Sequence, residues 1–368
     1  MPIQYASCPL DCFDGCRFKV QLQNDRITKI EGDPEHPVTA GFICAKGRNH
    51  LTRLYSAERI INPLVRDDGV LKPISMDNAL NLMADRIHQV VNEYGSTAIM
   101  HYSGSGSSGL LHDLGLRFFN ALGGVTLTEG SICWGSGLTA QKLDFGQPKA
   151  HSWDDLINSK LIVLWGRDPH TTNQHLWPYI EKARQKGARL MVVNPLLTSA
   201  SKHADLVLRP HPGSDGILAL TMAQIIISEG LIAHSFIEQF TTGYEEFYTL
   251  AHNISFDEAV ISTGLTEAEI RMAAQLYASC QPASILFGYG LQRYANGGHT
   301  VRYIDALAAL TGNLGVAGGG ANYANQVWGK DLNDITGATL AKTERRLPMS
   351  SLATAMMSTT DPPLQMVN

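Results

Sequence analysis

The sequence lacks a long apolar run. Its 368 residues include no stretch near the roughly 18 consecutive apolar residues that a membrane-spanning helix needs, because charges or glycines interrupt the longest candidates. We therefore expect no membrane segment. The chain is nevertheless 44% hydrophobic, which is enough to bury large cores, so its length and composition predict a globular protein of two or three domains.

An excess of positive charge is also missing. The chain has 29 Lys and Arg residues against 34 Asp and Glu, and its formal net charge is −5. Domains that bind nucleic acid normally carry a basic patch, so nucleic acid is not an expected partner. Residues 1–7 contain neither a basic nor an apolar signal region, and no twin-arginine signal is present. This favours a cytoplasmic, reducing location.

Cysteine is scarce, but four of the six cysteines fall within the first fifty residues, as Cys8, Cys12, Cys16 and Cys44. Four soft thiolates suit an iron–sulfur cluster or zinc. Structural zinc more often uses two close cysteine pairs, whereas Cys44 has no close partner. Disulfides are disfavoured in a reducing compartment. The spacing therefore favours a [4Fe-4S] cluster, with zinc, disulfides and unliganded thiols as alternatives.

The residues around these cysteines predict a small domain. Two short strands are expected at 18–22 and 26–31 about a turn at 23–25, and the turn-rich loop 32–37 would bring Cys44 back toward the other thiols. So short a domain needs a metal to hold it together, and we place its end at residue 58.

From residue 161 onward, short apolar strands alternate with helices. Strands are predicted at 161–165, 189–193, 206–208 and 284–288. Polar residues, glycine and proline follow the strands, in Gly166-Arg167-Asp168-Pro169, Asn194-Pro195 and Pro212-Gly213-Ser214-Asp215. In a parallel sheet such loops share one edge, where α/β folds bind nucleotides. Asp168 and Asp215 have a simpler alternative as solvated caps of helices.

A fifth cysteine, Cys133, lies between Gly130 and Gly135 at the start of a predicted helix. A thiol in this position can act as a nucleophile or a metal ligand. The alternative is a small buried core residue, which is our interpretation of Cys280. The last fifty residues predict irregular structure.

Together these motifs resemble the N-terminal half of the molybdopterin oxidoreductases, the dimethyl sulfoxide reductase superfamily that includes formate dehydrogenases. The resemblance covers essentially the whole chain. It rests on the four cysteines with Cys44-Ala45-Lys46-Gly47, on Cys133, on Trp165-Gly166-Arg167-Asp168-Pro169, on Pro212-Gly213-Ser214-Asp215, and on Leu310-Thr311-Gly312-Asn313 through Gly320.

The resemblance implies an α/β fold with three domains. Residues 1–58 would form a small [4Fe-4S] domain. Rossmann-like αβα domains of the formate dehydrogenase/DMSO reductase type would follow: residues 151–322 would bind a pterin guanine dinucleotide, and residues 59–150 with 323–368 would form an incomplete α/β domain carrying the metal-ligand cysteine. Family members are considerably longer and add a C-terminal β-barrel, which we expect to be absent from a truncated chain.

The resemblance also implies roles for single residues. Cys8, Cys12, Cys16 and Cys44 would bind one [4Fe-4S] cluster, and Cys133 would ligate molybdenum or tungsten. Lys46 would relay electrons between cluster and pterin, with a solvated lysine as the alternative. Gly290 and Arg293 would approach the metal and pterin. The guanosine and phosphates of one molybdopterin guanine dinucleotide would contact Trp165, Gly166, Arg167, Asp168, Asn194, Pro195, Gly213, Ser214 and Asp215.

The implied activity is two-electron redox, or oxygen or sulfur atom transfer, on a small substrate at a metal held by two pterins and Cys133. An electron-transfer protein is a candidate partner. Trp134 stands where formate dehydrogenases have histidine, which disfavours formate oxidation, and Asn194-Pro195 replaces the Asp-Pro of many relatives. The alternatives are a truncated, non-catalytic iron–sulfur remnant for electron transfer or binding, and a zinc-stabilised nucleotide-binding module.

Overall fold

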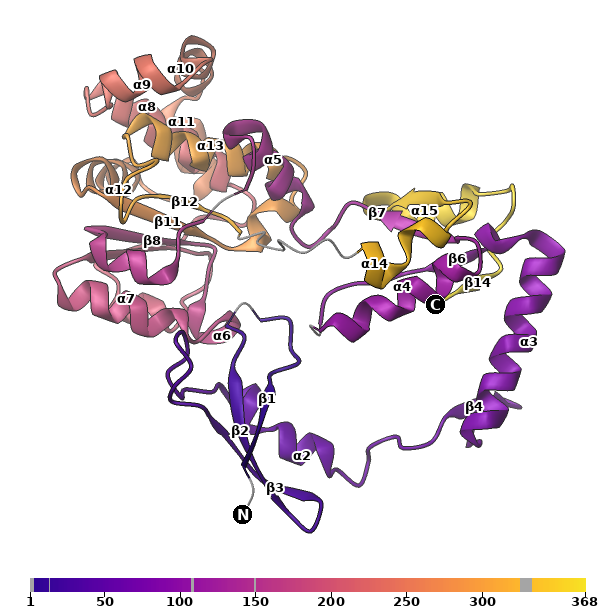
Figure 1. Ribbon diagram of the computed structural model, residues 1–368. Helices are drawn as coiled ribbons and strands as arrows, with labels where there is room; N and C mark the ends of the chain where they lie inside the picture. Colours follow the sequence, from indigo (N-terminus) through magenta and orange to yellow (C-terminus); the bar gives the residue numbers. More distant parts are fainter. Residues whose placement is uncertain (1–2, 13, 107–108, 149, 325–332) are drawn as a thin grey trace. The chain divides into compact units, whose positions relative to one another are not determined.

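The computed structural model describes residues 3–12, 14–106, 109–148, 150–324 and 333–368. The predicted domains also include residues 1–2, 13, 107–108, 149 and 325–332, which lie outside the described residues. The chain divides into two compact units, residues 1–130 with 329–368, and residues 131–328 (Figure 1). The expected α/β class is confirmed, and the three-domain division stays a prediction.

The first unit begins with the cysteine-rich segment. Strands β1 (Ile3–Ser7), β2 (Arg17–Gln23) and β3 (Arg26–Gly32) form an antiparallel sheet in that order. Asn24 and Asp25 have φ values of 50° and 59°, which these residue types tolerate in a two-residue hairpin turn. Short helices α1 (Ala45–Arg48) and α2 (His50–Leu54) follow. The two predicted strands are confirmed, whereas β1 was not foreseen.

The rest of this unit contains a parallel sheet in the order β13-β7-β6-β14. Ile87, Ile99, Phe119 and Val125 form its core. Its elements are β4 (Leu64–Asp67), β5 (Val70–Pro73), α3 (Met76–Tyr94), η1 (Ser96–Ala98), β6 (Ile99–His101), η2 (Leu110–Asp113), α4 (Leu114–Ala121), β7 (Thr126–Glu129), α14 (Asn333–Thr336), η6 (Ala338–Leu340), β13 (Arg345–Pro348), η7 (Met349–Ser351), α15 (Leu352–Ser358) and β14 (Met366–Val367).

The prediction of irregular structure over the last fifty residues was wrong. β13 pairs with β7 and β14 with β6, so both strands extend the parallel sheet. Arg345 anchors this segment, because its guanidinium donates to the Thr126 hydroxyl at 2.8 Å and to the carbonyl of Thr97 at 2.6 Å. Strands this short carry no alternation that a sequence pattern can detect.

The second unit is a doubly wound α/β fold. Its sheet has the order β10-β9-β8-β11-β12, and every neighbouring pair is parallel. Its elements are α5 (Gly135–Phe145), η3 (Trp153–Asn158), β8 (Leu161–Trp165), α6 (Pro169–Thr172), α7 (Leu176–Gln185), β9 (Arg189–Val193), η4 (Ala200–His203), β10 (Leu206–Leu208), α8 (Asp215–Ser228), α9 (His234–Phe240), α10 (Tyr244–His252), α11 (Phe256–Thr263), α12 (Glu267–Ser279), β11 (Ala283–Phe287), η5 (Tyr289–Arg293), α13 (Gly297–Leu310) and β12 (Gly320–Asn322).

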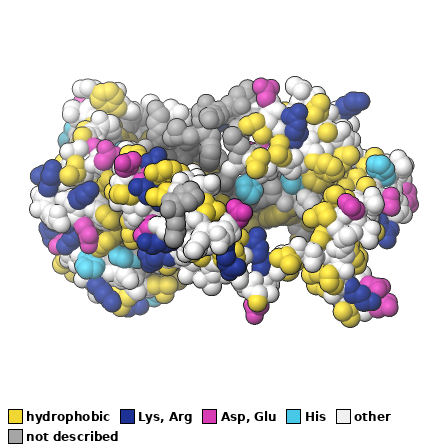
Figure 2. Space-filling view, turned by 60° about the horizontal axis from the view of Figure 1, so that its bottom comes forward, with side chains coloured by type: hydrophobic (Ala, Val, Ile, Leu, Met, Phe, Trp, Pro, Cys, Tyr) yellow, Lys and Arg dark blue, Asp and Glu magenta, His cyan; other side chains and the backbone are white. Residues whose placement is uncertain are grey.

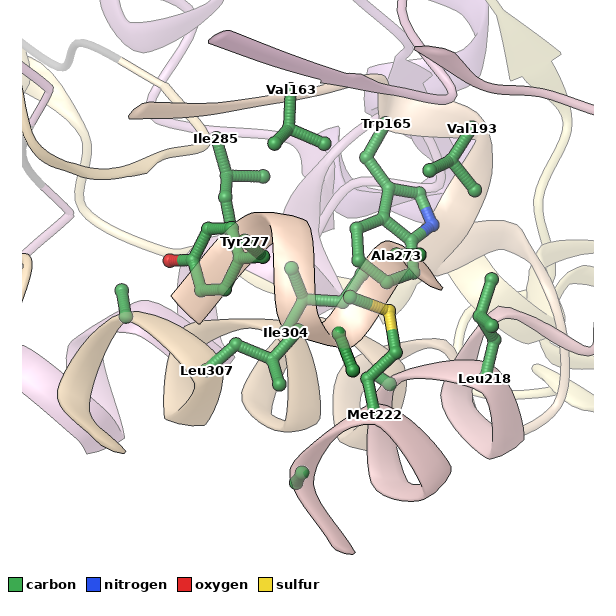
Figure 3. Packing of buried hydrophobic residues seen from close by; sticks show 14 of the residues in the cluster. Val163, Trp165, Val193, Leu218, Met222, Ala273, Tyr277, Ile285, Ile304 and Leu307 are labelled. Atoms are coloured by element: carbon green, nitrogen blue, oxygen red, sulfur yellow. The ribbon is translucent and has the colours of Figure 1, made fainter. Parts of the chain in front are cut away.

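Helices cover both faces of this sheet, which is why its strands read as continuous apolar runs. On one face Val163 and Trp165 pack with Met222 of α8, Tyr277 of α12 and Ile304 of α13 (Figure 3). The other face has a separate core, in which Ile162, Leu164 and Leu190 pack with Leu176 and Ile180 of α7.

The surface is mixed in charge. On the face shown in Figure 2, lysine and arginine side chains are interspersed with aspartate and glutamate, which agrees with the small net charge of −5. Among the helices that the structure describes, none combines the length and hydropathy of a membrane span.

Candidate functional site

The sheet of the second unit changes direction between β8 and β11. The chain adds β9 and β10 on one side of β8, then crosses to add β11 and β12 on the other. Ligands of open α/β sheets bind beyond the carboxyl ends of the strands at such a switch point. Here Gly288 lets the ends of β8 and β11 approach, because a Cβ at this position would lie 1.7 Å from the Gly166 carbonyl oxygen.

Cys133 lies on the loop before α5, and this loop contacts the turn η5 that follows β11. It is half-buried and precedes α5, and its backbone N–H donates to the Ser131 hydroxyl at 3.2 Å. Gln292, in the turn η5 that follows β11, binds this loop on both sides of the thiol. Its Nε2 donates to the carbonyls of Ile132 and Cys133, each at 3.0 Å, and its Oε1 accepts from the Ser136 N–H at 2.8 Å.

Two side chains of η5 lie near Cys133. The Nη2 of Arg293, which is exposed, lies 3.9 Å from the Cys133 Sγ. Burial raises the pKa of Tyr289 to about 12, the Arg167 guanidinium opposes that shift, and Cys133 adds to it. The Tyr289 hydroxyl is buried and finds no hydrogen-bond partner in the described part of the chain. A buried hydroxyl without a hydrogen-bond partner near Cys133 is consistent with a site that binds a ligand.

Aromatic rings pack behind the cysteine loop. Tyr323 donates its hydroxyl hydrogen to the Trp134 carbonyl at 3.2 Å, and the Tyr289 ring lies 5.6 Å from Trp134 and 5.2 Å from Tyr323. Burial raises the pKa of Tyr323. The cysteine loop is therefore held by its contacts with Tyr323 and Tyr289 as well as by Gln292.

Trp165 and Asp215 meet in the interior. The indole Nε1 of Trp165 donates to Asp215 Oδ1 at 2.9 Å, and Asp215 is only 6% exposed. Burial raises the pKa of Asp215, and the hydrogen bond from Trp165 opposes the shift. Asp215 is the first residue of α8 and is not a solvated cap.

Asp168 occupies the N-cap position of α6, but its side chain makes no capping hydrogen bond to the helix backbone and is not fully solvated. Its Oδ2 accepts from the Thr171 hydroxyl at 2.6 Å. Its Oδ1 is buried without a hydrogen-bond partner among the described residues, and the His170 Nδ1 lies 3.9 Å away. The Nη1 of Arg167 donates to the Phe287 carbonyl at 3.1 Å, which ties the end of β8 to β11.

The remaining predicted nucleotide residues follow β9 and β10. The Asn194 Oδ1 accepts from the Leu196 N–H at 3.0 Å, and the Ser214 hydroxyl donates to the His211 carbonyl at 2.7 Å. Gly213 has a φ of 86°, in the region that favours glycine. Beside these loops lies an open cavity of about 530 Å³, lined in part by Pro195 and His211. The predicted residues of the second unit thus lie along one sheet edge.

The four N-terminal cysteines belong to the first unit, and none of these four forms a disulfide. The Cys8 N–H donates to the Cys16 carbonyl at 2.8 Å. Burial raises the pKa of Cys8, and the nearby Cys16 and Cys44 raise it further, while Lys46 opposes the shift. Burial also raises the pKa of Cys12 to about 12.

This set of thiols fits an iron–sulfur cluster. Soft thiolates are the ligands that such clusters use, and bound iron would favour the thiolate form that burial disfavours. Within the described ranges, no three cysteine, histidine or acidic side chains are arranged to hold a single metal ion. A cubane takes its four thiolates at separate iron atoms. Lys46 is exposed on α1, and its positive charge opposes the rise in the pKa of the Cys8 thiol.

Sequence reasoning missed Gln292, Tyr289 and Tyr323. The only available signal was that Gln292 and Tyr289 share the loop that the resemblance places near the metal. Their partners in the cysteine loop are more than 150 residues away, as the separation of 159 between Gln292 and Cys133 illustrates.

Comparison with known families agrees with this geometry. Residues 59–362 match the molybdopterin oxidoreductase family, and residues 1–56 match the molybdopterin oxidoreductase Fe4S4 domain. The chain therefore belongs to the molybdopterin oxidoreductase family, which is a family of enzymes. The family implies a [4Fe-4S] cluster and a molybdopterin carrying molybdenum or tungsten, so the cluster is favoured over zinc.

Individual relatives support the same family. The chain is 37% identical to the probable oxidoreductase YyaE of Bacillus subtilis (strain 168), over 99% of this chain and 55% of that protein. It is 27% identical to formate dehydrogenase H of Escherichia coli (strain K12), over 86% of this chain and 45% of that protein. Acetylene hydratase from Pelobacter acetylenicus superposes with a TM-score of 0.70 at 25% identity, over 85% of this chain and 44% of its own. The chain spans about half the length of the curated relatives it matches.

Proposed function

We propose that this chain is the cofactor-binding portion of a molybdenum or tungsten oxidoreductase that holds two molybdopterin guanine dinucleotides and one [4Fe-4S] cluster. Its reaction is a two-electron redox change, or an oxygen or sulfur atom transfer, on a small substrate. One observation carries the proposal: Gln292 holds Cys133 at the switch point of the sheet, beside Arg293. When bound, the metal and its pterins supply the redox chemistry.

Cys133 is the proposed metal ligand, because its half-buried thiol lies on a loop fixed from two sides. Arg293 places a positive charge and hydrogen-bond donors next to the sulfur, which suits an anionic or oxygen-bearing group. The unpartnered Tyr289 hydroxyl offers one more hydrogen bond at this place. The rings of Trp134, Tyr289 and Tyr323 limit the access of water from behind. Gly290, exposed in the same turn, lets the backbone approach a pterin.

The nucleotide portion of one pterin cofactor is assigned to the loops after β8, β9 and β10. The buried Asp168 Oδ1 is an acceptor available to the N–H groups of a guanine. Trp165 and Asp215 are hydrogen-bonded to each other in the interior, so they would support these loops from the buried side. The proposed contact residues are Trp165, Gly166, Arg167, Asp168, Asn194, Pro195, Gly213, Ser214 and Asp215.

In the first unit, Cys8, Cys12, Cys16 and Cys44 are the proposed ligands of the cluster, and Lys46 is the proposed electron relay. The positive charge of Lys46 lowers the pKa of the Cys8 thiol. Lys46 therefore lies close enough to the proposed cluster ligands to interact with them electrostatically. A one-electron centre also calls for an electron-transfer protein as partner.

The test is cofactor analysis of the full chain, purified anaerobically from cells supplied with molybdate and tungstate. We expect about four iron atoms per chain and about two guanine nucleotides per molybdenum or tungsten atom. Cys133→Ala should keep the iron and lose most of the molybdenum or tungsten. Cys280→Ala is the matched control, because Cys280 caps α12 away from these loops.

Two outcomes would count against the proposal. If Cys133→Ala retains the wild-type content of molybdenum or tungsten, Cys133 is not the ligand. If the wild-type chain binds iron but contains no molybdenum, tungsten or guanine nucleotide, the non-catalytic iron–sulfur alternative is correct.

A further inference from the structure

Gln292 is a buried amide in a loop. It is only 5% exposed, and both ends of its amide group are used. Nε2 donates to the carbonyls of Ile132 and Cys133, while Oε1 accepts from the Ser136 N–H. One side chain therefore bonds the backbone at three points that bracket the Cys133 thiol.

The backbone of Gln292 is itself fixed. A Cβ at Gly297 would lie 2.2 Å from the Gln292 carbonyl oxygen, so α13 can begin here only because residue 297 is glycine. On the other side, the Leu291 side chain packs against the end of β8, where a Cβ at Gly166 would lie 3.2 Å from it. The η5 turn is thus held between the sheet and α13, and Gln292 extends this rigid frame to the cysteine loop.

Arg293 follows Gln292 in the chain, and its Nη2 lies 3.9 Å from the Cys133 Sγ. We infer that Gln292 is a positioning residue that fixes the direction of the Cys133 thiol and its distance from Arg293. This inference rests on the proposed function in taking Cys133 as the metal ligand. The positioning acts on the thiol itself, so it can be measured on protein without metal.

The amide is the only side chain of this length that makes all three bonds. Glutamate keeps an acceptor for the Ser136 N–H but turns a second oxygen toward two carbonyl oxygens. Methionine keeps the length and bulk and makes none of the bonds. Gln292→Glu therefore removes two of the three hydrogen bonds, and Gln292→Met removes all three. Gln275→Met is a matched control, because Gln275 bonds to Glu229 on the exposed surface.

The experiment is alkylation of the full chain with iodoacetamide, without cofactor, followed by mass spectrometry of each cysteine peptide. With Gln292→Glu and Gln292→Met, we expect at least a fivefold faster reaction at Cys133 and an unchanged rate at Cys280. Gln275→Met should change neither rate. A general loss of structure would instead accelerate both cysteines. An unchanged rate at Cys133, or an equal increase at Cys280, overturns the inference.

A second measurement needs no variant and therefore does not depend on a variant folding. In the wild-type chain the Ser136 amide should exchange with deuterium at least tenfold more slowly than a free amide, because it donates to Gln292. Exchange at the free rate would also overturn the inference.

The proposed function is tested separately on metal-loaded protein by X-ray absorption. If Cys133→Ala keeps the wild-type number of sulfur neighbours at the metal, the ligand assignment fails, while the alkylation result for Gln292 still stands. If the assignment holds, the Gln292 variants should show a longer or more disordered metal–sulfur shell.

Discussion

Two aspartates share a buried contact between α5 and α13. Asp305 is 1% exposed, and its Oδ1 accepts from the Gln141 Nε2 at 2.8 Å. Asp144 accepts from the Arg302 Nε at 2.7 Å. Burial raises the pKa of Asp305 well above its ordinary value, the Gln141 hydrogen bond opposes this shift, and Asp144 adds to it. Burial also raises the pKa of Asp144. The pKa of Asp305 is therefore higher in the folded protein than in the unfolded chain.

Asp305→Asn should therefore stabilise the fold at neutral pH. The folded pKa lies above the unfolded one, so the free energy of unfolding falls as pH rises through the interval between them. Asparagine removes this loss and keeps an acceptor for Gln141. We expect a gain of about 1–2 kcal/mol at pH 7 and almost none near the ordinary aspartate pKa of about 4. The measurement is urea unfolding at several pH values.

Asp85→Asn, on α3, is the matched control for that series. It removes one charge without touching the buried pair, so it should not reproduce the pH-dependent gain. A gain from Asp305→Asn that is the same at every pH would show that the pKa of Asp305 is equal in the folded and unfolded protein, which would contradict the prediction.

Single residues also show where sequence reasoning reached its limit. The cysteines and the polar residues after each strand could be chosen from their own neighbours in the sequence. The role of Asp215 could not, because a helix-start aspartate suggests a solvated cap, whereas its actual partner, Trp165, stands 50 positions earlier. Gln292 could be noticed only through the loop it shares with Arg293, because the residues that it binds, such as Cys133, lie far away in the sequence.

At the scale of elements, α5 contains a glycine whose substitution has opposing effects. Alanine normally stabilises a helix relative to glycine by about 1 kcal/mol. A Cβ at Gly137, however, would lie 2.1 Å from Cζ of the Tyr323 ring. Tyr323 is 1% exposed and cannot move aside freely. The steric effect should win, so we expect Gly137→Ala to destabilise the protein by about 1–3 kcal/mol in denaturant unfolding.

Gly135→Ala provides the comparison within the same helix. Its nearest neighbour would be the Ser131 Cβ at 3.4 Å, an ordinary contact, so this substitution should be close to neutral. If Gly137→Ala were as well tolerated as Gly135→Ala, α5 would not be packed against Tyr323 as described.

The strands whose bounds were predicted correctly are buried ones. β8, β9 and β10 match their predicted bounds, because each is an apolar run buried in a sheet that helices cover on both faces. β1 is exposed along its length, and β14 has only two residues, so neither leaves a hydrophobic pattern. Their existence depends on pairing with β2 and β6, which lie elsewhere in the sequence.

At the scale of the whole molecule, the cluster domain and the doubly wound unit differ in what stabilises them. The sheet of the second unit is enclosed by two large apolar clusters. Among the residues that the structure describes, the buried core of the cysteine-rich segment consists of Cys16, Phe18, Val20 and Ile43, and one of these is itself a proposed iron ligand. Small domains with so little core usually need a metal to stay folded.

Loss of the cluster should therefore loosen one part of the molecule and leave the other intact. In Cys16→Ala, or after iron is removed by an oxidant and a chelator, we expect the amides of β2 and β3 to exchange with deuterium at least about tenfold faster, a loss of about 1.4 kcal/mol of local stability. The amides of β8, β9 and β11 should keep their protection, because their core contains no metal ligand.

Hydrogen exchange followed by mass spectrometry resolves these strands, and Cys280→Ala serves as the control because it removes a cysteine without removing iron. Unchanged protection of β2 and β3 after complete loss of iron would mean that Phe18, Val20 and Ile43 hold the domain without the cluster. Parallel loosening of β8 and β9 would mean instead that the two units unfold cooperatively. Loosening confined to β2 and β3 would show that the metal supplies the stability that four buried side chains cannot.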